Sequence, residues 1–265
     1  TTIANHAMQL NNVRCAAVAF ASALLSSATL AAYVNLTPTP IIANGAMVFA
    51  GNAIGLNKNG ATNAPGGAGS VGAFMRVDNN CALVTTSTDG TFPAGTTNDW
   101  RLGGSCSMVD IPAGAVVRKA QLIWSGSVVS GTENVTASLN STVTFIRPNG
   151  TTVTITPAAD ATAQAAGNFY TRSADVTAQL IGGGMYGVRG VPATQTDSNT
   201  SGNTGGWTLA VIYELLSLPA RAMSIFAGAE VGGNPAASVS GFCTPNTSAQ
   251  AGRLLVSAVE GDSGI

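Results

Sequence analysis

The sequence predicts an all-β fold: a single large β-sandwich or jelly-roll-like domain of about a dozen strands with one short helix. From residue 33 onward, short apolar or alternating runs rich in Thr and Val are separated by turn-forming Gly, Pro and Asn. Glycine alone accounts for 32 of the 265 residues. No repeat, linker or domain boundary interrupts this pattern, and the length fits one all-β unit.

Each expected strand has its own local signal. The run from Ala120 to Trp124 is apolar on both faces, so it belongs in the middle of a sheet. Pro148-Asn149-Gly150 supplies turn geometry between two β-branched runs, which predicts a hairpin. The expected strands are residues 45–50, 71–77, 115–125, 135–139, 143–147, 151–156, 207–214, 222–227 and 253–259.

Helical signals occur once in this β pattern. Ser173 is a suitable N-cap, Asp175 lies in the first turn and three glycines follow Ile181, so one or two helical turns are expected over residues 173–181. Residues 57–70 and 194–206 are too poor in apolar side chains for a core. We expect them to be surface loops, and loops are the favoured places for ligand contact.

Charged side chains are scarce, at 9% of the chain against about 25% in a typical soluble domain. There are 11 Lys and Arg, 12 Asp and Glu and one His, with a formal net charge of −1. This balance lacks the basic footprint on which nucleic-acid binding relies. It also leaves few groups for acid–base catalysis. No nucleic-acid partner is therefore expected.

Residues 1–32 differ from the rest and predict upstream residues followed by a signal peptide that starts at Met8. Arg14 supplies a positive charge, residues 15–25 are small and apolar apart from Ser22, and small residues suited to cleavage follow up to Ala32. A buried core helix is the alternative. The first interpretation makes residues 33–265 an exported β-sandwich head domain, located outside the cell.

The cysteines fit an oxidising compartment. Cys15 leaves with the signal peptide, whereas Cys81 and Cys106 lie 25 positions apart in one turn-rich region. A disulfide between them would stabilise the fold by about 3 kcal/mol in the chain-entropy model. Cys243 is expected to be a buried free thiol. Neither a CxxC motif nor a histidine beyond His6 is present, so no metal or cofactor is expected.

Catalytic motifs are weak. The sequence Gly-Asp-Ser263-Gly resembles a serine-protease nucleophile, but the only histidine that would activate it is His6, in the leader. Glu214 ends an apolar strand and is expected at the surface, although a buried acid there would suit a hydrolase. Glu260 and Asp262 offer two oxygens to calcium, which binds six to eight. The expectation is therefore no enzyme and no catalytic residue, with a hydrolase kept as a minor alternative.

A series of motifs carries a family resemblance across nearly all of residues 45–262. In order they are Gly51-Asn-Ala-Ile-Gly-Leu-Asn-Lys58, Asn63-Ala-Pro-Gly66, Gly69-Ser-Val-Gly-Ala-Phe74, Asp89-Gly-Thr-Phe-Pro-Ala-Gly-Thr-Thr97, Ile111-Pro-Ala-Gly114, Ala120-Gln-Leu-Ile-Trp124, Tyr170-Thr-Arg-Ser-Ala-Asp-Val-Thr177, Gly187-Val-Arg-Gly-Val-Pro-Ala-Thr-Gln195, Gly206-Trp-Thr-Leu-Ala-Val-Ile-Tyr-Glu214, Ser217-Leu-Pro-Ala-Arg221 and Gly241-Phe-Cys-Thr-Pro245. The chain resembles the N-terminal domain of long bacterial surface proteins with repeats of the domain-of-unknown-function-eleven type.

This resemblance implies a non-catalytic structural or adhesive head domain of a secreted or cell-surface repeat protein. Ig-like repeats would follow it after Ile265, and its partners would be cell-surface glycans or neighbouring surface proteins. The family supplies no catalytic residues to transfer, and the Cys81 and Cys106 pair is not a feature of it. The alternative is a carbohydrate-binding module on the cell surface, with Trp100, which lies in a polar context, stacking on a sugar.

Overall fold

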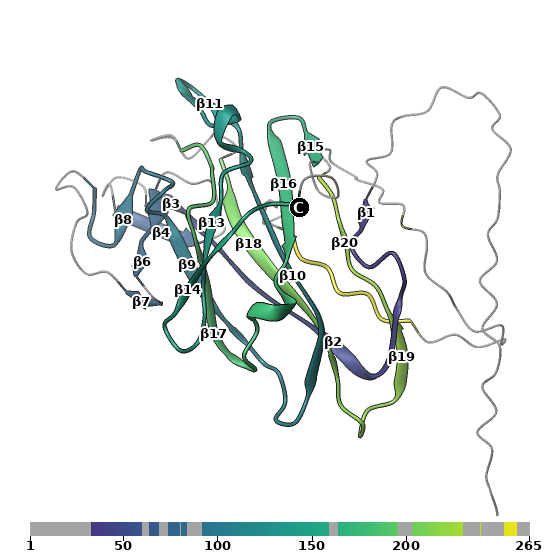
Figure 1. Cartoon of the computed structure of the whole chain (residues 1–265). Coiled ribbons are helices and arrows are strands. Elements are labelled where there is room, and N and C mark those ends of the chain that lie inside the picture. The colour runs from purple at the N-terminus through teal and green to yellow at the C-terminus, as the bar shows by residue number, and fades with distance from the viewer. Residues whose placement is uncertain are drawn as a thin grey trace, which may run out of the picture.

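The computed structural model describes residues 33–59, 64–68, 74–79, 81–83, 92–158, 164–195, 203–229, 239 and 252–258. The fold is all-β, as the sequence predicts, and its antiparallel sheets form a sandwich (Figure 1). No helix in these residues has the length and apolar character needed to cross a membrane. The expected leader, residues 1–32, lies outside the described part of the chain, as does Cys243.

The larger layer is a six-stranded antiparallel sheet in the order β15-β16-β10-β18-β2-β19. The strand expected at its centre, β10, lies between β16 and β18, because side chains on both of its faces are apolar. A β-bulge between Val117 and Lys119 shifts the register of its pairing with β18. The strands are β2 (Ile41–Ala53), β10 (Val116–Ser127), β15 (Gln164–Ala166), β16 (Phe169–Asp175), β18 (Gly205–Glu214) and β19 (Ala220–Met223).

The second layer is a four-stranded antiparallel sheet in the order β14-β13-β17-β9. Its hairpin between β13 and β14 is the one that the Pro148-Asn149-Gly150 signal predicts. The Gly150 N–H donates to the carbonyl of Arg147 at 2.8 Å, and Gly150 has a left-handed φ of 79°. The strands are β9 (Gly104–Val109), β13 (Val143–Ile146), β14 (Thr152–Ile155) and β17 (Gly184–Arg189).

Smaller sheets flank these two layers. A third sheet has the order β4-β3-β5-β8, and three two-stranded ladders pair β1 with β20, β11 with β12 and β6 with β7. These strands are β1 (Val34–Asn35), β3 (Gly55–Asn59), β4 (Ala64–Ala68), β5 (Phe74–Arg76), β6 (Asp78–Asn79), β7 (Ala82–Leu83), β8 (Thr96–Thr97), β11 (Val129–Ser130), β12 (Glu133–Asn134) and β20 (Phe226–Ala227).

Both layers contribute to the main hydrophobic core. Trp124 of β10 and Trp207 of β18 are register partners and are 0% and 2% exposed, so the sequence prediction that both are core residues is confirmed. From the smaller layer, the rings of Phe145 and Tyr186 stack with centroids 5.5 Å apart. A second cluster, which includes Ile225, packs around Ala210 and Ile212 on the other face of β18. Both faces of the central strands are therefore covered.

The helix expected over residues 173–181 is wrong. Residues up to Asp175 form β16, and a single 3₁₀ turn follows at Thr177–Gln179. The Ser173 hydroxyl does not cap a helix, because it is buried and accepts a hydrogen bond from Gln121 Nε2 at 2.9 Å. The Asp175 carboxylate instead accepts the Thr177 N–H at 2.8 Å and sets the turn. Pairing with β10 outweighs the local capping signal.

Two expected strands are also wrong. Residues 135–139 contain the 3₁₀ turn Thr136–Ser138, because the Asn134 side chain accepts the Thr136 N–H at 2.9 Å and starts a turn. The described part of the last expected strand, residues 253–258, pairs with no sheet. The expected surface loop at residues 57–70 contains the end of β3 and all of β4, so part of it is sheet.

Candidate functional site

The ends of β10 and β18 form the base of the candidate site. Gly126 and Gly205 are register partners at these strand ends. A Cβ atom on Gly126 would lie 2.5 Å from the carbonyl oxygen of Pro192, and one on Gly205 would lie 3.0 Å from the Cβ of Ala193. Glycine at both positions therefore lets the segment that follows β17 cross directly over the strand ends. We call this region, defined by Gly126, Ser127, Thr194, Asn203 and Gly205, the loop end.

Ser127 is the centre of a buried hydrogen-bond network at the loop end. Its N–H donates to the carbonyl of Thr204 at 2.9 Å, and its carbonyl accepts the N–H of Thr194 at 3.1 Å. The Thr194 hydroxyl lies 2.8 Å from Ser127 Oγ and 3.0 Å from Asn203 Oδ1. All four residues are buried. The network fixes both flanks of residues 196–202, which lie outside the described part of the chain.

This burial corrects the expectation that residues 194–206 are simply a surface loop. Thr194 and Asn203 are 2% and 1% exposed, and Gly205 already belongs to β18. The error has a physical cause, since hydroxyl and amide side chains that bond to one another can be buried without apolar neighbours. Low apolar content therefore does not show whether residues such as Thr194 and Asn203 lie at the surface.

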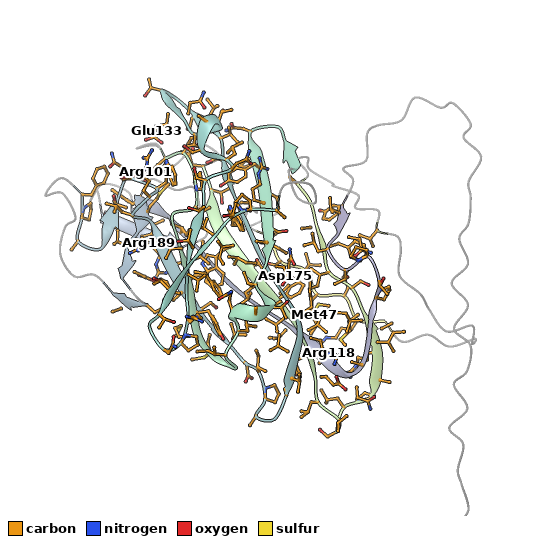
Figure 2. All side chains as sticks on the ribbon, in the orientation of Figure 1. Met47, Arg101, Arg118, Glu133, Asp175 and Arg189 are labelled. Carbon is orange, nitrogen blue, oxygen red and sulfur yellow. A yellow bond between two sulfur atoms is a disulfide. The ribbon has the colours of Figure 1, made fainter. Side chains whose placement is uncertain are left out.

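The carboxylate of Glu133 also binds the backbone that directly precedes residues 196–202. Glu133, in the hairpin of β11 and β12, accepts the N–H of Gln195 through Oε2. Burial raises the pKa of Glu133, and the hydrogen bond from Gln195 opposes that rise. The hairpin is itself attached to the sheet, because the Val129 N–H donates to Asn168 Oδ1 at 2.7 Å. Figure 2 shows Glu133 and Arg101 in the half of the sandwich from which β11 projects.

Two buried side chains of β16 hold the backbone next to the loop end. The Tyr170 hydroxyl donates to the Pro192 carbonyl at 2.6 Å, and burial raises the pKa of this phenol. The Arg172 guanidinium donates through Nε to Asn140 Oδ1 at 3.0 Å. It also lies over the Tyr170 ring, 5.5 Å from the centroid, and burial lowers its pKa. The backbone at residue 192 is therefore fixed from the sheet.

Trp100, the predicted ligand contact, is only partly exposed and packs against the main core. The guanidinium of Arg101 lies over its ring, 4.5 Å from the centroid, and forms an ion pair with Asp99 at 3.2 Å. A sugar that stacked on that face of the ring would have to displace Arg101. The turn containing Trp100 is close to the chain after β17, since the Gly190 N–H donates to the Gly103 carbonyl at 2.9 Å.

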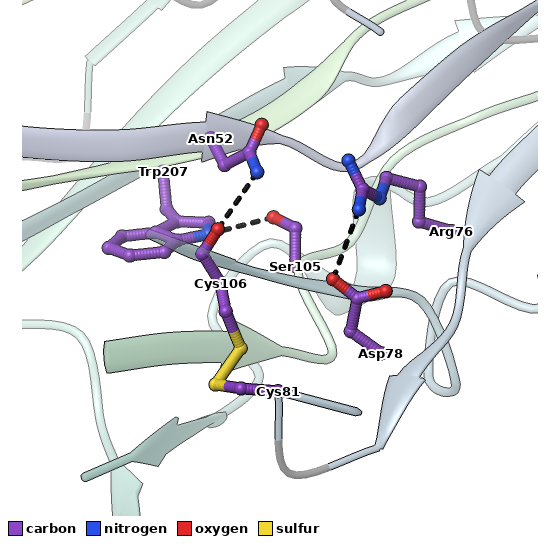
Figure 3. The surroundings of a disulfide bond; sticks show 7 residues. All are labelled: Asn52, Arg76, Asp78, Cys81, Ser105, Cys106 and Trp207. Atoms are coloured by element: carbon purple, nitrogen blue, oxygen red, sulfur yellow. Dashed lines mark hydrogen bonds and ion pairs between the residues drawn. A yellow bond between two sulfur atoms is a disulfide. The ribbon is translucent and has the colours of Figure 1, made fainter. Parts of the chain in front are cut away.

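The cysteines selected from the sequence, Cys81 and Cys106, are joined by a disulfide (Figure 3). Cys106 lies on β9, and Cys81 precedes β7 with a left-handed φ of 65°. The sulfurs lie against Gly187 of the neighbouring β17, where a Cβ atom would be 2.4 Å from Cys106 Sγ. The Cys106 carbonyl also accepts Asn52 Nδ2 at 2.9 Å, which links this sheet to β2. The disulfide thus connects the β6-β7 ladder to β9 of the sandwich.

Of the residues considered for catalysis, Glu214 is the one that lies in the described part of the chain. Glu214 is at the end of β18, as expected, where it is partly exposed and forms an ion pair with Arg118 at 3.1 Å. Ser263, Glu260 and Asp262 lie outside the described residues. Within the described part of the chain, no group of three His, Cys, Asp or Glu side chains is placed to hold a metal ion.

Sequence reasoning missed the residues that build the loop end. Ser127 and Thr194 are 67 positions apart, and each is an ordinary polar residue beside a turn. The paired glycines at the strand ends were the available signal, since glycine inside a strand often marks a close approach of another backbone. No protein-family model, curated protein or solved structure matches this chain.

Proposed function

We propose that this chain is a non-catalytic head domain of a secreted or cell-surface bacterial repeat protein, and that it adheres through the loop end. The observation that carries the proposal is the buried network around Ser127, which fixes both flanks of the polar segment 196–202. Residues 196–202 have the sequence Thr-Asp-Ser-Asn-Thr-Ser-Gly, in which six side chains can form hydrogen bonds. Binding residues are commonly presented on such loops by a rigid scaffold.

Display of the chain on a non-adherent bacterium tests this proposal. Adhesion would be measured to immobilised glycans, to immobilised surface protein and to abiotic glass. Ser127→Ala should reduce adhesion several-fold, because it removes the hydroxyl that orders the loop flanks. Thr144→Ala is the matched control, since it removes a hydroxyl from β13 in the other sheet. Adhesion equal to that of cells displaying no protein would contradict an adhesive role.

The repeat-protein part of the proposal rests on the motif resemblance and has a separate test. The gene would be sequenced downstream of the codon for Ile265. Tandem Ig-like repeats ending in a wall-sorting signal or membrane anchor would support a stalked head domain. A stop codon directly after Ile265 would refute it, whatever the adhesion assay shows.

A carbohydrate-binding module is the second candidate, favoured by the partial exposure of Trp100, whose turn bonds to the chain after β17 through Gly103 and Gly190. In this form of the proposal, a sugar replaces the Arg101 guanidinium over the indole ring. Arg101→Ala should then strengthen glycan binding, whereas Trp100→Ala should abolish it. If neither substitution changes binding on a glycan array, this candidate is refuted, and adhesion through protein contacts is left.

A further inference from the structure

We propose that β14 is a self-association edge, where two copies of this chain pair through antiparallel β14 strands. β14 is the outermost strand of the four-stranded sheet, with β13 as its only strand neighbour. An edge strand presents unpaired N–H and C=O groups to any chain that can align with it. The inference is independent of the adhesive function proposed above.

The backbone register shows which groups of β14 face outward. The Arg147 N–H donates to the Thr151 carbonyl at 2.9 Å, and Phe145 pairs with Val153. Because hydrogen-bonding residues alternate along an antiparallel strand, Val153 and Ile155 continue that ladder toward β13. The N–H and C=O groups of Thr152, Thr154 and Thr156 therefore point to the open side. No hydrogen bond to these groups comes from the residues that the structure describes.

The open edge lacks two features by which proteins often prevent edge pairing, namely charged side chains and bulges. Residues 148–158 contain no charged side chain, and β14 pairs with β13 without a bulge. Proline stands only outside the strand, at positions 148 and 157. The opposite edges of the two layers differ, because β19 carries the exposed Arg221 and the Asn52 side chain bonds to the backbone of β9. β14 is thus more open to pairing than β19 or β9.

The partner that fits this edge is a second copy of the same strand. A two-fold axis at Thr154 would pair the two Thr154 residues, place each Thr152 opposite the partner copy's Thr156, and place each Val153 opposite Ile155. The exposed face would then be a row of threonine pairs and the other face a row of β-branched apolar pairs, and both kinds of pair are favourable between strands. With no charge on the segment, two copies meet without electrostatic repulsion. A two-fold contact needs only this one self-complementary surface.

Sedimentation velocity of the purified chain over a hundredfold concentration range tests the inference. Wild-type protein should form dimers. Thr154→Lys should weaken the dimer at least tenfold, because it places two ammonium groups opposite each other at the axis. Thr144→Lys, on the same face of the sheet but on the internal strand β13, is the matched control and should leave the dimer largely intact. Thermal unfolding of each variant checks that it folds.

A cysteine at the axis tests the geometry. Thr154→Cys should form an intermolecular disulfide under mild oxidation, since paired residues of adjacent strands are within disulfide reach. Met108→Cys, exposed on the opposite edge strand, should not cross-link. A wild-type chain that stays monomeric at every concentration would overturn the proposal. So would a dimer that is unaffected by Thr154→Lys and is not cross-linked by Thr154→Cys.

Discussion

Gly187 can be used to test whether the disulfide is packed as the structure shows. Replacing it with alanine adds a Cβ atom 2.4 Å from Cys106 Sγ, 3.1 Å from Cys81 Sγ and 3.2 Å from the Ser105 carbonyl oxygen. An ordinary contact between such atoms is about 3.5–4.0 Å, so the first distance is roughly 1 Å too short. Either the sulfurs or the strands must move.

Two energies set the size of the effect. Overpacking of this kind destabilises a protein by about 1–3 kcal/mol. If the clash also prevents the disulfide, whose cysteines are 25 positions apart, the protein loses a further contribution of about 3–4 kcal/mol. Against this, alanine is favoured over glycine within a strand by about 0.5–1 kcal/mol. Because a 2.4 Å approach is a severe overlap, the upper end of the overpacking range applies, so we expect Gly187→Ala to lower the free energy of unfolding of the oxidised protein by about 2 kcal/mol, and by more if the disulfide is lost.

A double-mutant cycle separates the clash from other effects of the substitution. Gly187→Ala would be compared in the wild-type chain and in a chain carrying Cys81→Ala and Cys106→Ala, with guanidinium unfolding as the assay. Without the sulfurs, the Ser105 carbonyl is the remaining close neighbour, and the change should be within about 1 kcal/mol of neutral. A loss of stability equal in both backgrounds to within about 0.5 kcal/mol would refute the packing described here.

Three further predictions follow from individual contacts. Trp207→Phe should destabilise the fold by about 1 kcal/mol more than Trp124→Phe in urea unfolding, because Trp207 Nε1 donates to Ser105 Oγ at 3.0 Å whereas Trp124 Nε1 has no partner among the described residues. For Asp175, burial raises the pKa, but hydrogen bonds from Lys119 and Thr177 outweigh it and hold the pKa below its usual value. Its contribution is therefore present above about pH 4 and is lost as the pH falls through the lowered pKa, so Asp175→Asn should flatten the acid limb of a stability titration. Gly126→Ala should reduce stability more than Gly150→Ala in thermal unfolding, since the first meets the Pro192 carbonyl at 2.5 Å and the second meets open space despite its left-handed φ.

Local signals predicted the parts of the fold that depend on neighbouring residues. The hairpin around Asn149, the central position of β10 and the burial of the two core tryptophans all follow from short segments of sequence. The helix predicted after Ser173 failed because pairing between β16 and β10 is a long-range contact. The side chain that bonds to Ser173 is 52 positions away, at Gln121. Patterns within one segment do not contain that information.

The loop end was less predictable, because its key contacts join uncharged polar residues from separate segments. Ser127, Thr194 and Asn203 have no shared motif, and each is typical of a turn when considered alone. The strand-end glycines Gly126 and Gly205 were visible in the sequence, but their meaning depends on the chain that crosses them. A polar residue next to such a glycine has two possible environments, solvent or a buried network, and composition does not choose between them.

The shortage of charge has a consequence for the proposed adhesion. The buried network uses hydroxyl, amide and backbone groups, which do not titrate between pH 5 and 9. Beside this network, Glu133 accepts the N–H of Gln195, and burial raises the pKa of Glu133. The carboxylate form accepts the Gln195 N–H, so adhesion through this end should change as Glu133 takes up a proton, at a pH above that at which a free glutamate titrates. Glu133→Gln should remove that change, and an acid sensitivity that survives the substitution would place its origin elsewhere.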